Sequence, residues 1–77
     1  MLTYKAMYKE LDGGLHAEVL DFPGVLTRGR DLDETRRLLA GALEVMAETC
    51  WLAGEPLPRP DPSRSHPDAD LEEPIHL

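Results

Sequence analysis

The only candidates for an active site on a strand lie close together in one predicted strand. His16, Glu18 and Asp21 are candidate acids, bases or metal ligands, and two-metal nuclease chemistry needs several carboxylates that converge on one point. Side chains alternate between the two faces of a strand, so His16 and Glu18 share one face and Asp21 points to the other. The spacing therefore predicts no converging catalytic site, and we predict that the chain is not an enzyme.

The single cysteine and the histidines also lack the pattern of a catalytic or metal site. Cys50 has no second cysteine with which to form a disulfide, and no sequence neighbour is placed to activate its thiol. His16, His66 and His76 lack the spacing with Cys50 that zinc sites use. We predict a small buried side chain at Cys50 and no bound metal or cofactor.

Composition and charge limit the possible partners. The 77 residues form one domain at most, and 15 acidic against 8 basic side chains give a formal net charge of −7. No basic stripe is present, so direct nucleic-acid binding is not expected, whereas an acidic surface suits a basic protein partner. The sequence shows no signal-peptide pattern and no apolar run of about 18 residues, so we expect a soluble cytoplasmic protein without a membrane segment.

The elements that must position these side chains begin with a predicted hairpin. Residues 2–11 alternate apolar and polar side chains, and Asp12-Gly13-Gly14 then supplies residues that tolerate the positive φ of a tight turn. A second strand is predicted over 15–21, and Pro23-Gly24 favours a turn into a short third strand over 25–28. Only one face of such a sheet needs burial, which predicts a half-solvated antiparallel meander.

The clearest signal in the sequence is a long helix over 32–53. Asp31 and Glu34 form a capping box, Gly54 suits the position after the last turn, and Pro56 prevents continuation. The apolar face of this helix is wider than one contact with a sheet requires. We therefore predict homo-oligomerisation, as a dimer or a higher assembly, through a second apolar stripe, the sheet edge, or both. This predicted oligomer interface consists of Leu38, Gly41, Val45 and Leu52.

Composition changes after the helix. Residues 55–77 hold six of the seven prolines and are acidic, which is typical of a segment that does not fold alone. We divide the chain into a domain over 1–58 and a Pro-rich acidic tail over 59–77, whose residues 74–77 could add a short fourth strand. The predicted fold class is α+β, a three-stranded antiparallel meander with one long helix packed on it, in the order β-β-β-α-β.

Two positions on the helix have two interpretations each. We expect the Pro-rich tail to cover Trp51, since proline rings pack well on indole; the alternative is an exposed Trp51 that anchors a protein interface. Gly41 either allows another backbone to approach closely or is a tolerated weak point in the helix.

The order of these features resembles the HicB antitoxin family. The resemblance covers roughly residues 4–58, ending in the stretch from Gly54 to Pro58. Each motif alone is common, whereas their order and spacing together are fairly specific. The matching residues are Tyr4, Asp12-Gly13-Gly14, His16-Ala17-Glu18-Val19, Asp21-Phe22-Pro23-Gly24-Val25, Thr27, Gly29, Leu32-Asp33-Glu34, Leu39, Ala42 and Leu43.

This resemblance implies a domain similar to a partial ribonuclease H fold without its active site. It also implies a function, which is to bind and block a small basic RNA-cleaving toxin of the HicA type. Residues 59–77 are too short and too acidic for the DNA-binding domain that many members add, so operator binding by this chain is not expected. The alternative function is a stand-alone oligomeric scaffold or ligand-binding protein without a toxin partner. We interpret one set of matching residues as mainly architectural, and this family motif consists of Asp21, Phe22, Pro23, Gly24 and Gly29.

Overall fold

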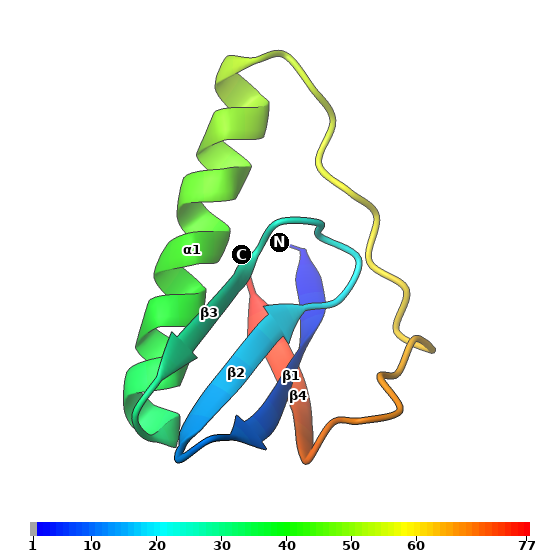
Figure 1. The fold of residues 1–77 in the computed structure, drawn as a ribbon. Coiled ribbons are helices and arrows are strands. Elements are labelled where there is room, and N and C mark those ends of the chain that lie inside the picture. Colours follow the sequence, from blue (N-terminus) through cyan, green and yellow to red (C-terminus); the bar gives the residue numbers. More distant parts are fainter. Residues whose placement is uncertain (1) are drawn as a thin grey trace.

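The computed structural model describes residues 2–77 and shows one helix packed on a four-stranded antiparallel sheet (Figure 1). The elements are β1 (Thr3–Leu11), β2 (Gly14–Val19), β3 (Leu26–Gly29), α1 (Leu32–Leu52) and β4 (Leu71–His76). In the sheet the strands follow the order β3-β2-β1-β4, so β3 and β4 form the edges. The predicted α+β class and β-β-β-α-β order are confirmed. Over residues 2–77, no helix combines the length and apolar character that a membrane crossing requires.

The first two strands form the hairpin that the Asp-Gly-Gly turn predicts. Asp12 and Gly13 adopt φ angles of 49° and 80°, and Leu11 pairs with Gly14 across the turn. The predicted second strand is two residues too long at its end. The backbone has left the extended conformation by Asp21, whose φ is 71°.

The helix lies over β2 and β3 and buries one apolar stripe against them. The Asp31 carboxylate accepts a hydrogen bond from the Glu34 backbone nitrogen at 2.8 Å, and Gly54 turns the chain at a φ of 72°. Leu39 and Leu43 point to the sheet and are buried. They pack in a core with Tyr4, Ala6, Tyr8, Ala17, Val19, Phe22 and Val25.

The other face of the sheet is covered by residues 59–70, which follow the helix and which we call the strap (Figure 1). Since side chains alternate along β1, Lys5 and Met7 point away from the core that α1 covers. Met7 is only 1% exposed, and the Lys5 ammonium donates to two strap carbonyls. The expectation of a half-solvated sheet is therefore only partly right. The irregular Pro-rich strap buries Met7, whereas His16 and Glu18 on the same face stay partly exposed.

The fourth strand begins at Leu71, three residues earlier than the predicted 74–77. It pairs antiparallel with β1, from Thr3 opposite His76 to Tyr8 opposite Leu71. The sequence prediction missed the start of this strand because of Glu72 and Glu73, since two consecutive carboxylates are atypical of a strand. The pairing brings the two ends of the described chain side by side (Figure 1).

Candidate protein-binding surfaces

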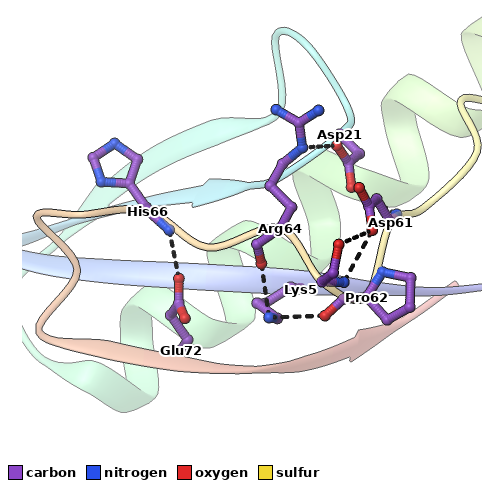
Figure 2. Close-up of polar contacts among 8 residues, drawn as sticks. Lys5, Asp21, Asp61, Pro62, Arg64, His66 and Glu72 are labelled. Carbon is purple, nitrogen blue, oxygen red and sulfur yellow. Dashed lines mark hydrogen bonds and ion pairs between the residues drawn. The ribbon is translucent and has the colours of Figure 1, made fainter.

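The loop between β2 and β3 contains Asp21, and this residue is tied to the strap. Its carboxylate forms an ion pair with Arg64 and accepts a hydrogen bond from the Asp61 backbone nitrogen at 2.8 Å (Figure 2). Only 10% of the Asp21 side chain is exposed. Asp21 therefore holds the strap in place and does not offer a free carboxylate to a substrate.

The other residues of the predicted family motif make contacts within the chain as well. Phe22 is buried, and its ring centre lies 5.6 Å from that of Tyr4. Gly24 has a φ of 89°, a backbone conformation that residues other than glycine rarely adopt. Gly29, at the end of β3, lies against Thr35 of α1, so an added β-carbon would meet the Thr35 backbone. These contacts are architectural, and a role of the motif in partner binding stays a prediction.

Two further side chains hold the strap from the sheet. Lys5 Nζ donates to the carbonyl oxygens of Pro62 at 3.1 Å and Arg64 at 2.7 Å (Figure 2). The Glu72 carboxylate accepts a hydrogen bond from the His66 backbone nitrogen at 2.8 Å. This hydrogen bond holds the pKa of Glu72 below its usual value. Charged groups from β1, the β2–β3 loop and β4 thus fix the strap at three points.

Two open hollows flank the strap. One of about 520 Å³ lies along residues 18–26 and reaches Arg64 and His66. The other, of about 430 Å³, lies between residues 60–62 and the edge strand at 72–74. The charged side chains that line both hollows already have partners within the chain. Neither hollow therefore presents a free charged group around which a ligand site would be built.

The residues considered for acid–base or metal chemistry do not converge. His16 Nε2 and Glu18 Oε2 lie 2.7 Å apart on the strap side of β2, whereas Asp21 pairs with Arg64. Among residues 2–77, no group of three His, Cys, Asp or Glu side chains is close enough to hold a metal ion. Cys50 is a half-buried free thiol that packs against the core.

The outer face of α1 carries large apolar side chains that remain in solvent. The exposed fractions are 45% for Leu38, 63% for Val45, 80% for Trp51 and 77% for Leu52. The expectation that the tail covers Trp51 is wrong, because the strap crosses the far face of the sheet instead. Gly41 is also open, since an added β-carbon would meet no atom within 4 Å.

The acidic side chains are used differently in the two halves of α1. In the first half, Glu34 pairs with Arg30, and Arg36 binds Glu73 through two hydrogen bonds of 2.8 Å. Burial, with the neighbouring Glu73 carboxylate as a second cause, raises the pKa of Tyr8 beside this pair to about 12.

In the second half of α1, Glu44 and Glu48 have no ion-pair partner among residues 2–77, and the last turn contains no basic residue. Neither glutamate was identified as a candidate from the sequence. A signal was present, because no Lys or Arg lies three or four positions from either glutamate. This end of the helix therefore combines free negative charge with exposed apolar surface.

The two sheet edges differ in what they offer a partner strand. Leu77 N donates to Leu2 O, and the alternation of an antiparallel ladder then turns the backbone of Pro74 outward. Proline has no N–H to donate, so β4 is a poor edge for strand addition. The same alternation, counted from the Val19–Val25 bond, leaves the N–H groups of Leu26 and Arg28 pointing outward on β3. The open edge is β3.

A four-stranded antiparallel sheet with one capped helix, in this topology, is the fold of a HicB-type antitoxin domain. The N-terminal domain of the Burkholderia pseudomallei antitoxin HicB aligns with a TM-score of 0.83 and 18% identity, over 99% of this chain and 98% of that chain. A chain of the HicA3 and HicB3 toxin–antitoxin complex aligns with a TM-score of 0.74 and 19% identity, over 97% and 96% of the two chains. No protein-family model matches the sequence, and the search of curated proteins found no match. At these identities the likeness establishes the fold, so the HicB-like fold implied by the sequence resemblance is confirmed.

Proposed function

We propose that this protein is a HicB-like antitoxin, a non-catalytic protein that binds and blocks a small basic RNA-cleaving toxin of the HicA type. The observation that carries the proposal is the likeness, over nearly the full length, to a chain of a toxin–antitoxin complex. The cytoplasm is the matching location, since the toxin would act on RNA there.

The charge of the chain supports a basic partner. Its formal net charge is −7, and an acidic protein attracts a basic one over distances of several ångströms before contact. Most carboxylates near the strap and the first half of α1 are paired within the chain, so the free charge available to a partner lies elsewhere.

Co-purification tests this proposal directly. A tagged copy of the chain, co-expressed with the small basic protein encoded next to it, should retain that protein through washing at moderate salt. If no small basic protein is encoded nearby, or none is retained by the folded chain, the antitoxin proposal loses its support.

A second candidate function is that of a stand-alone oligomeric scaffold or ligand-binding protein. The specific observation in its favour is the exposed apolar stripe of α1, in which the side chains of Leu38, Val45 and Leu52 are 45%, 63% and 77% exposed. The helix that carries this stripe packs on the β3 side of the sheet, where the open edge lies (Figure 1). Its proposed interface is formed by Leu38, Gly41, Val45 and Leu52.

This second candidate makes a sharp prediction for sedimentation velocity. The wild type should sediment as a dimer, and Val45→Glu should sediment as a monomer because the new charge would be buried in the interface. Ala40→Glu is the matched control, since it adds the same charge at an exposed position of the same helix outside the stripe. Identical monomers for the wild type and Val45→Glu would exclude the oligomer.

A further inference from the structure

We propose that the outer face of the second half of α1 is the docking surface for a basic protein partner. This inference rests on the proposed antitoxin function and adds to it the place on the chain that the basic toxin contacts. We call this surface the acidic ridge, and it consists of Glu44, Val45, Glu48, Trp51 and Leu52.

Helix geometry brings these five side chains together. At 100° and 1.5 Å per residue, they occupy an arc of about 120° and a length of about 12 Å. Around the helix, Glu44 and Glu48 lie between Trp51 on one flank and the Val45–Leu52 pair on the other. A partner would therefore meet two carboxylates with an apolar wall on each side.

The apolar part of the acidic ridge is large, and no segment of the part of the chain that the structure describes covers it. Trp51, Leu52 and Val45 are the three most exposed large apolar side chains among residues 2–77. Tryptophan is enriched among the residues that dominate binding energy at interfaces. An indole face also attracts the cationic side chains that a basic partner carries.

The charge of the acidic ridge selects the chemistry of its occupant. Among residues 2–77, Glu44 and Glu48 have no ion-pair partner. The carbonyl end of the helix adds partial negative charge, which no basic residue in the last turn offsets. The first half of α1 differs, because Arg30 and Arg36 neutralise its carboxylates from within the chain. Lysine or arginine side chains of a partner would supply the missing positive charge.

The same charges disfavour a second copy of the chain as the occupant. In an antiparallel helix pair with two-fold symmetry centred on Val45, each flank faces its own copy. Glu44 and Glu48 would then lie opposite their own counterparts, and like charges brought together in an interface cost free energy. A basic protein gains attraction from the side chains that would repel a second protomer.

Charge reversal tests the assignment. The double variant Glu44→Lys/Glu48→Lys should weaken binding of the toxin encoded next to this chain by roughly tenfold or more. The matched control is Glu10→Lys/Asp68→Lys, which makes the same change in net charge at exposed carboxylates outside the second half of α1. Affinity of the control within about threefold of the wild type supports the acidic ridge. Equal affinities of the two double variants for the toxin would contradict the acidic ridge as the docking surface, but would not contradict the antitoxin function.

A second readout keeps the inference testable if the wild type binds no toxin. Trp51 is the only tryptophan, so its fluorescence reports directly on the acidic ridge. The probe is a synthetic amphipathic helical peptide of lysine and leucine, titrated into the full chain. A saturable blue shift in the wild type and the control variant, but not in Glu44→Lys/Glu48→Lys, supports the inference. No saturable shift, or a wild-type dimer that shields Trp51 from the peptide, would overturn it.

Discussion

Gly29→Ala is expected to be among the most damaging single substitutions in this protein, with a loss of about 3 kcal/mol or more in the free energy of unfolding. An added β-carbon would lie 3.0 Å from the Thr35 backbone nitrogen, 3.1 Å from its Cα and closer still to its hydroxyl oxygen. Thr35 is fully buried, and its hydroxyl donates to the Asp31 carbonyl at 2.6 Å. The first turn of α1 would have to move away from β3 to make room.

The matched control for this substitution is Gly41→Ala in the same chain. An added β-carbon at Gly41 meets nothing within 4 Å, and alanine forms helix better than glycine by about 0.5–1 kcal/mol. Urea unfolding should therefore move in opposite directions for the two variants, to a lower midpoint for Gly29→Ala and a higher one for Gly41→Ala. Equal midpoints would show that the close approach of β3 and α1 is not as described.

Leu39→Ala is the second substitution with a large expected effect, a loss of about 2–5 kcal/mol. Leu39 is 0% exposed and lies between α1 and the sheet. A domain of this size is stabilised by only about 4–12 kcal/mol in total, so the substitution should remove a large part of that stability.

The neighbouring residue provides the control. Leu38→Ala makes the same chemical change one position away, where the side chain is 45% exposed and is outside the core. Its expected cost is below about 1 kcal/mol. Thermal unfolding followed by circular dichroism separates the two, and a similar loss in both variants would contradict the assignment of the buried stripe.

Local signals predicted most of the fold. The cap residues Asp31 and Gly54 mark the two ends of the helix, because each is favoured at the cap position that it occupies. The Asp12-Gly13 turn likewise sets the register of the hairpin. The strap was not predictable by such rules, since its position depends on the long-range contacts of Lys5 and Asp21 with residues about 40 to 60 positions away.

Only some features of the candidate binding surface on α1 could be predicted from the sequence. The spacing of apolar residues predicted the width of the apolar helix face. Val45 and Leu52 are exposed, as the predicted second stripe requires. The exposure of Trp51 could not be predicted, because it depends on the path of the strap. The unpaired state of Glu44 and Glu48 depends on which arginines the fold directs toward other carboxylates, although the lack of basic neighbours along the helix was a usable sign.

The antitoxin function is tested most directly by the growth of cells that express the small basic protein encoded by the adjacent gene. Induction of that protein alone should arrest growth, and co-expression of the wild-type chain should restore it. Leu39→Ala, which strongly destabilises the fold, should restore growth less well than the wild type, whereas Gly41→Ala should restore it fully. Continued growth arrest in the presence of soluble, folded wild-type protein would contradict the antitoxin function.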